Sequence, residues 1–148
     1  MVTDRSYVET NRAALERLRT LIARLSDEDF GRPIGHGWTV SAALAHLAFW
    51  DRRTVTAMEQ WEKEGVKIVP GDPNPTNNDM LPEWLAMPGR EAAAEALAAA
   101  GAADQKAASL APEIVEQVLA QRPRSLIRAA HRGGHLDEIE QALSHLAP

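Results

Sequence analysis

Residues 39–65 read TVSAALAHLAFWDRRTVTAMEQWEKEG and predict a long amphipathic helix. We expect Thr39 to be its N-cap residue and the helix to end near Gly65, a length of roughly 38 Å at 1.5 Å per residue. The residues expected on the stripe that faces a bundle interior are Leu44, Leu47, Trp50, Thr54, Met58 and Trp61. The side expected to face solvent carries Asp51, Glu59 and Glu62.

Helical patterns also precede and follow this segment. Residues 3–25 form the first, with Thr3 as the expected cap, and residues 90–110 and 124–146 form the third and fourth long helices. Short helices are expected over 77–86 and 112–120, and residues 26–38 are a linker rich in turn formers. No strand pattern appears. We therefore predict one all-α domain over residues 1–148, a four-helix bundle with short extra helices in its connections.

The connection after residue 65 bears on the order of the helices. Pro70, Gly71, Pro73 and Pro75 prevent a continuous helix there. About twelve extended residues reach roughly 40 Å, which is enough to return along the whole bundle. The second and third long helices can then run parallel, in up-down-down-up order, although length alone does not require this.

Histidines are the residues most suited to chemistry in this chain. His131 and His135 stand at i and i+4, so their rings lie on one side of a helix, about 6 Å apart along its axis. Ile127, Ile139 and Ala142 share that face, so the two rings should point inward. His46 lies beside the apolar stripe of residues 39–65. Two buried imidazoles need several partners, and one metal ion would satisfy both.

Other interpretations of the same residues stay open. An isolated HxxxH pair is a weak signal, and a single histidine such as His46 is more often a satisfied core residue. Glu138 is either a fourth ligand, an acceptor for a ligand histidine or a surface carboxylate. We expect His36 and His145 to be exposed. The pair Gly133 and Gly134 suggests a neighbouring helix or ligand that must come close.

The composition limits the class of protein. There are no cysteines, which excludes disulfides, thiolate metal sites and a cysteine nucleophile. The formal net charge of −5 argues against nucleic acid as a partner. No segment approaches the ~18 apolar residues of a membrane span, so no membrane association is expected. The polar first residues show no secretion signal, and we predict a cytoplasmic protein.

Two segments resemble the motifs of the DinB-like superfamily. Residues 37–51, GWTVSAALAHLAFWD, are similar to its second-helix signature, in which a Trp-Thr or Trp-Ser start is followed by His-Leu. Residues 131–139, HRGGHLDEI, are similar to its last-helix HxxxH motif. The order and separation of the motifs agree across nearly the whole chain.

This resemblance implies an up-down-down-up bundle and a divalent metal, zinc or nickel, held by His46, His131 and His135. It also implies a homodimer, because members often form one. The superfamily includes thiol-dependent S-transferases and the mycothiol-dependent maleylpyruvate isomerase. No catalytic residue is assigned beyond the metal ligands.

Three hypotheses for function follow. The first is a metal-dependent enzyme that transfers a low-molecular-weight thiol to a small-molecule electrophile, or a hydrolase that uses metal-activated water. The second is a non-catalytic bundle with a structural metal that binds a partner or a small ligand. The third, action on DNA, rests on the family's name and is disfavoured by the acidic charge balance.

Overall fold

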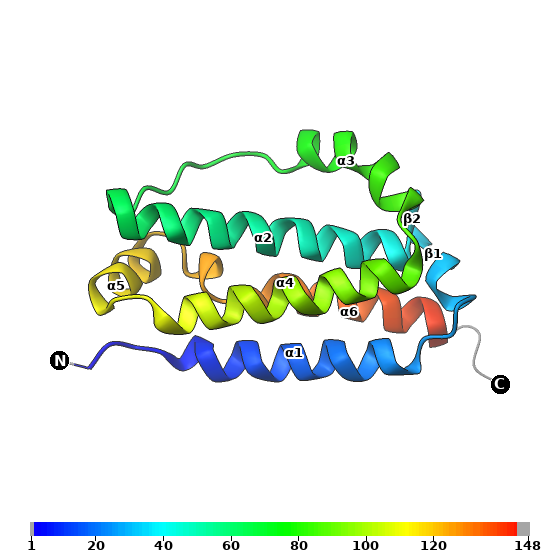
Figure 1. Ribbon diagram of the computed structural model, residues 1–148, viewed down its shortest axis with the longest axis horizontal. Coiled ribbons are helices and arrows are strands. Elements are labelled where there is room, and N and C mark those ends of the chain that lie inside the picture. The colour runs from blue at the N-terminus through cyan, green and yellow to red at the C-terminus, as the bar shows by residue number, and fades with distance from the viewer. Residues whose placement is uncertain (1, 145–148) are drawn as a thin grey trace.

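Four long helices form the body of the molecule in the computed structural model, which describes residues 2–144 (Figure 1). They are α1 (Ser6–Arg24), α2 (Val40–Glu64), α4 (Gly89–Ser109) and α6 (Arg128–Ser144). Helices α1 and α6 run in one direction, and α2 and α4 run in the other. The predicted all-α four-helix bundle in up-down-down-up order is therefore confirmed. Every helix within residues 2–144 is too short or too polar to cross a bilayer.

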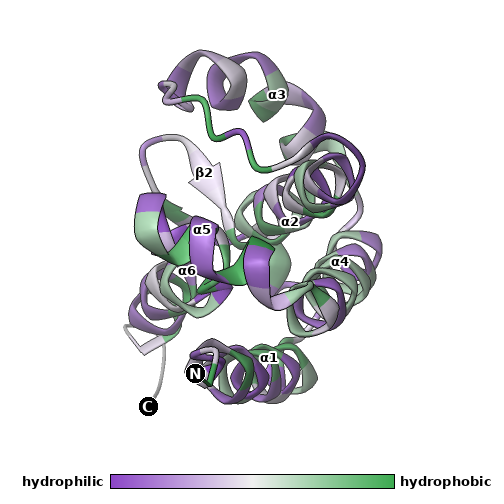
Figure 2. Ribbon diagram, turned by 90° about the vertical axis from the view of Figure 1, so that its left-hand side faces the viewer, coloured by the Kyte–Doolittle hydropathy of each residue, from purple (hydrophilic) through white to green (hydrophobic). Residues whose placement is uncertain are grey.

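The parallel course of α2 and α4 depends on the chain that joins them. Residues 65–73, here called the return segment, run back along α2 to reach α3 (Asn74–Ala86), which lies outside the four-helix body (Figures 1 and 2). The return segment is not helical, as its prolines and glycines predict. Helix α3 begins three residues before the predicted Asn77, because Pro75 fits the first turn of a helix.

A small hairpin precedes α2, and the prediction of a linker without strands is wrong there. After the 3₁₀ turn η1 (Asp29–Gly31), strand β1 (Pro33–Gly35) pairs antiparallel with β2 (Trp38–Thr39). The turn residues Gly35, His36 and Gly37 have φ angles of +107°, +55° and +79°. These values favour glycine, which explains the glycines of this segment. The strands are too short to give an alternating pattern in the sequence.

The start of α2 agrees with its prediction, but the start of α1 does not. The Thr39 hydroxyl accepts a hydrogen bond from the backbone N–H of Ala42 at 3.1 Å, which is a helix cap. The predicted cap Thr3 instead bonds Glu116 through its hydroxyl. Asp4 accepts the bond from the Ser6 N–H at 2.9 Å. Helix α1 therefore begins at Ser6 rather than at residue 3.

The second half of the chain differs from prediction at one helix start. Helix α5 (Pro112–Gln121) lies one residue from its predicted end. The last helix begins at Arg128 rather than residue 124, because the 3₁₀ turn η2 (Pro123–Ser125) takes up the residues after α5. The predicted end of this helix at Leu146 lies outside the described residues, as does His145.

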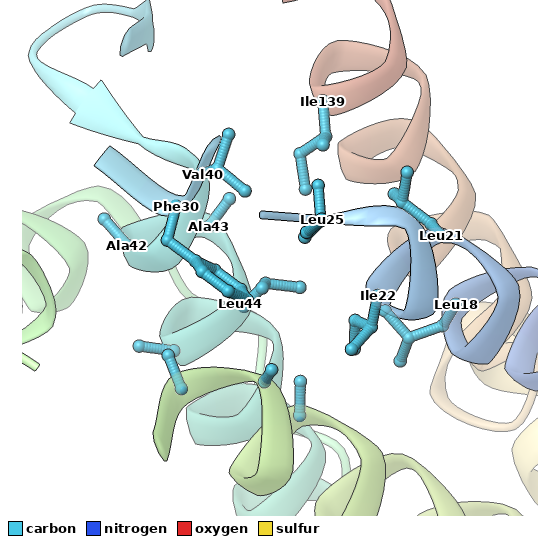
Figure 3. Close-up of a cluster of buried hydrophobic side chains, with 14 of the residues drawn as sticks. Leu18, Leu21, Ile22, Leu25, Phe30, Val40, Ala42, Ala43, Leu44 and Ile139 are labelled. Atoms are coloured by element: carbon cyan, nitrogen blue, oxygen red, sulfur yellow. The ribbon is translucent and has the colours of Figure 1, made fainter. Parts of the chain in front are cut away.

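The interior is divided into two apolar clusters. One joins the end of α1 to the start of α2 and includes Leu18, Leu21, Leu44 and Ile139 (Figure 3). The other lies toward α5 and includes Met58 and Trp61. The alanines of α4 pack closely against α2, as the composition of that helix predicts. Polar residues that bear on the candidate site lie between the two clusters.

Close packing occurs at a glycine that the sequence did not single out. A Cβ atom on Gly89, the first residue of α4, would lie 2.4 Å from Cγ of the buried Phe30. By contrast, a Cβ on Gly133 would lie 3.9 Å from Arg17, and one on Gly134 would meet nothing within 4 Å. The expectation of a closely approaching helix at Gly133 and Gly134 is therefore wrong, and a ligand close to them stays a prediction.

Candidate metal centre

The structure brings together three of the five histidines. His46 lies in the second turn of α2, and His131 and His135 lie one turn apart on α6. Each of the three offers a ring nitrogen, and these atoms all lie within 4.8 Å of one another. Nε2 of His46 is 2.9 Å from Nε2 of His131. Residues separated by 85 positions in the chain thus meet at one point, as the sequence interpretation required.

Tryptophan side chains pack against two of the three rings. The Trp38 ring lies parallel to the His135 ring at a centroid distance of 6.0 Å, and it contacts His46 edge-on at 4.8 Å. The buried Trp84 meets His46 from another side at 5.0 Å. The hairpin and α3 therefore serve the site, because they place Trp38 and Trp84 around His46.

The electrostatic environment keeps the imidazoles neutral. Burial, together with the nearby His135, lowers the pKa of His46 to about 3. The same causes lower the pKa of His131 to about 2. Burial also lowers the pKa of His135, although Glu138 opposes this shift. Neutral imidazole is the form that binds a metal ion.

Two ring nitrogens of the cluster are buried without an aligned hydrogen bond to any described residue. Nδ1 of His46 is buried and has no hydrogen bond within residues 2–144. Nδ1 of His135 also lacks an aligned hydrogen bond, although Oε1 of Glu138 is 3.2 Å away. Leaving such a group unpaired costs about 1–3 kcal/mol. A tetrahedral zinc ion with bonds of about 2.1 Å has ligand atoms roughly 3.4 Å apart, a spacing that lies between the shortest separation of 2.9 Å and the 4.8 Å limit of this cluster. The residues thus fit a divalent ion.

Two further predictions concern Glu138 and His36. Glu138 is half exposed, and its Oε1 atom lies 3.2 Å from Nδ1 of His135 without an aligned hydrogen bond, so its role as an acceptor for that ring stays a prediction. It is not part of the group whose ligand atoms converge within the described residues. His36 is exposed at the tip of the hairpin, as predicted.

Asp51 contradicts its predicted position on the wet side of α2. Its side chain is 4% exposed and accepts a hydrogen bond from Nε of Arg128 at 2.9 Å. Arg132, which is 1% exposed, lies 3.5 Å from the same carboxylate and forms two 3.0 Å hydrogen bonds with Asp104 of α4. Arg132 also donates to the backbone carbonyl of Asn11 on α1 at 3.1 Å.

These five residues, Asn11, Asp51, Asp104, Arg128 and Arg132, form a buried polar layer with members from all four long helices. This layer was not predicted from the sequence. A signal was available: Asp51 is spaced four residues from Leu47 and seven from both Leu44 and Met58, so it lies on the apolar stripe. On α6 the arginines alternate with the histidines, so this helix joins the polar layer to the histidine cluster.

A cavity of about 1010 Å³ borders the three histidines. Its wall includes Trp38 of the hairpin, Trp50 of α2 and residues 68–73 of the return segment. Cavities that hold small-molecule ligands have volumes of about 300–1,000 Å³. The cluster therefore faces a space large enough for a small-molecule ligand.

The fold and the site together define a class: helical bundles in up-down-down-up order with three histidines converging beside an open cavity. A profile described as the DinB superfamily matches residues 10–146. The chain belongs to the DinB superfamily. It matches none of the curated proteins and none of the solved structures with which it was compared.

The lowered pKa values predict that acid destabilises the metal-free protein. The unfolded chain takes up protons near pH 6.5, whereas His46 and His131 in the fold resist protonation, so stability is lost as the pH falls below 6.5. Each imidazole contributes about 1.4 kcal/mol one unit below that value, so we expect a loss of about 2–3 kcal/mol between pH 7.5 and pH 5.5. Urea unfolding in the presence of a chelator measures the free energy of unfolding at each pH.

A matched pair of variants controls this experiment. His46→Asn should remove between a third and a half of the pH dependence, because His46 is one of three histidines whose pKa is lowered and His135 is shifted with opposition from Glu138. His36→Asn should retain it, because His36 is exposed and asparagine tolerates its positive φ. Equal pH dependence of stability in the two variants would show that buried His46 is not one of the groups responsible.

Proposed function

We propose that this protein is a divalent-metal-dependent enzyme whose ion is held by His46, His131 and His135. The observation that carries this proposal is the convergence of three neutral imidazoles beside a cavity. Catalytic zinc sites use three protein ligands and keep one position for water or substrate. Imidazole ligands suit zinc and nickel.

The chemistry needs little from other side chains. A bound ion would supply positive charge that favours the deprotonated form of a thiol or a water molecule. Glu138 lies 3.2 Å from the ring of His135, and the Trp38 ring lies parallel to the same histidine ring. The chain has no cysteine, so a sulfur nucleophile has to come from a cosubstrate. Transfer of a low-molecular-weight thiol to an electrophile fits these constraints.

A turnover assay tests the proposal. The protein is loaded with zinc or nickel and given bacillithiol, mycothiol or glutathione with a reactive electrophile. We expect thiol consumption that disappears on chelation and in the His131→Ala variant, whereas His36→Asn retains it. No metal-dependent consumption with any of the three thiols would refute thiol transfer, and parallel assays with ester and amide substrates test the hydrolase variant.

A non-catalytic role with a structural metal is the alternative. Such an ion would sit in a closed site, and its removal would lower the melting temperature strongly. The cavity beside the histidines favours the enzyme, because it gives a ligand access to the cluster. Water exchange measured on a manganese- or nickel-loaded sample separates the two roles: exchangeable water supports catalysis.

Two further predictions rest on the sequence and the family resemblance. We expect a homodimer, which sedimentation velocity measures directly. We also expect a cytoplasmic location, which fractionation of cells that produce the protein would test.

A further inference from the structure

The cavity wall concentrates positive charge in an acidic chain. The net charge of the protein is −5, yet Arg122, Arg124 and Arg128 all line the cavity near the three histidines. Asp72 and Glu138 are the carboxylates on the same wall. The arginines come from one short stretch that ends α5, forms η2 and begins α6. A bound divalent ion would add to this positive field.

Arg128 is held at the base of this stretch. It is 8% exposed, and its Nε atom donates to Asp51 at 2.9 Å. Its two Nη atoms have no hydrogen-bond partner within residues 2–144, while the side chain lines the cavity. Asp51 thus fixes one edge of the guanidinium and leaves the terminal nitrogens for a group in the cavity. Guanidinium pairs with a carboxylate through two parallel hydrogen bonds.

Arg124 adds a second cation on the solvent side of Arg128. It is exposed, lines the cavity and forms no ion pair with any described residue. Arg122 differs, because it donates to Ser125 at 3.1 Å. The wall also includes the apolar side chains of Trp38, Trp50 and Val69. The cavity therefore offers cationic groups, apolar surface and the histidine cluster.

We propose that Arg124 and Arg128 form a carboxylate subsite, so that the cavity takes a small molecule with a carboxylate at one end and its reactive group toward the histidines. This inference rests on the proposed function, since it names the substrate class of that site. The carboxylate accepts hydrogen bonds from the Nη atoms of Arg128 and pairs with Arg124. The apolar part of the molecule contacts the tryptophans.

A matched pair of thiols tests the subsite by calorimetry on the zinc-loaded protein. 3-Mercaptopropionate carries the carboxylate, and 3-mercaptopropanamide replaces it with a neutral amide of similar size. We expect the acid to bind roughly 10-fold more tightly, because hydrogen bonds to charged groups contribute about 1.5–3 kcal/mol. Equal affinities for the acid and the amide would overturn the proposal.

Variants assign the preference to the named residues. Arg124→Gln should lower the affinity for the acid by roughly 5-fold and leave the affinity for the amide unchanged. Arg124→Lys should retain part of the affinity for the acid that Arg124→Gln loses. Arg24→Gln is the control, because Arg24 is exposed at the end of α1 and does not line the cavity. Comparison between variants cancels any difference in thiol acidity between the probes. Equal weakening of acid and amide by Arg124→Gln would also overturn the subsite.

Failure of the metal centre is detected separately. Zinc content and amide binding report on the histidines alone. If the protein binds no zinc, hexanoate and hexanamide are titrated into the metal-free protein, with fluorescence of Trp38 and Trp50 as the readout. A preference for hexanoate that Arg124→Gln removes then supports the subsite, and the absence of a preference refutes it.

Discussion

Replacement of His46 by alanine is expected to lower the affinity for zinc by roughly 100- to 1,000-fold. Four-ligand zinc sites contribute about 10–16 kcal/mol, so one ligand accounts for about 2.5–4 kcal/mol, at 1.4 kcal/mol per factor of ten. His46 is the single contribution of α2 to the cluster, while α6 supplies the other two. His131 and His135 alone should retain weak binding through their i, i+4 spacing. Competition with a chromophoric chelator measures the affinity.

Controls separate loss of a ligand from loss of the fold. His46 is buried, so its removal also leaves a space, whereas His135 lies nearer the cavity with 18% of its side chain exposed. His135→Ala should therefore lower zinc affinity by a similar factor at a smaller cost in stability. His36→Ala, at the exposed hairpin tip, should bind zinc as the unmodified protein does. Unchanged affinity in both His46→Ala and His135→Ala would show that the metal is elsewhere.

We expect the Arg132→Met variant to lower the free energy of unfolding by about 3–5 kcal/mol. Removal of one partner of a buried ion pair leaves an uncompensated charge, and such losses are of this size. Arg132 bridges Asp51 and Asp104, so two carboxylates lose a partner. Burial already raises the pKa of Asp104, and Arg132 opposes that shift. Urea unfolding at pH 7 measures the change.

An exposed arginine provides the comparison for this variant. Arg12 pairs with Glu9 on the surface of α1 at 2.5 Å. Arg12→Met should change stability by less than about 1 kcal/mol, because exposed pairs contribute little. The double variant Arg132→Met with Asp104→Asn should recover part of the loss, because it removes a stranded charge together with its partner. A single Arg132→Met effect no larger than that of Arg12→Met would mean that the polar layer does not stabilise the fold.

The candidate site was predictable where local spacing carries the information. The i, i+4 spacing of His131 and His135 defines one helical face, and this relation survives any arrangement of the bundle. Spacing alone does not predict that His46 lies opposite these two histidines. That prediction came from the resemblance to a family whose ligands lie on the helices that correspond to α2 and α6. The order of the long helices was likewise consistent with the connection length but not required by it.

The polar layer was not predictable as a whole, because its pairs are long-range. Asp51 meets Arg128 across 77 positions, and the charge of an aspartate usually indicates solvent. Its spacing on the apolar stripe was the available signal, and the sequence analysis gave more weight to the charge. The hairpin was missed because its strands are too short to show a period. Gly89 was missed because its neighbour Phe30 is distant in the chain.

The return segment has an evolutionary consequence. Because α2 and α4 are parallel, the chain has to travel back along the molecule, and residues 68–73 of that passage also form part of the cavity wall. Neither the histidines nor the polar layer belongs to this stretch. Mutations there change the cavity wall while the scaffold and the three histidines stay intact. Natural divergence can therefore change ligand selectivity through the return segment. Mutagenesis in the laboratory can do the same.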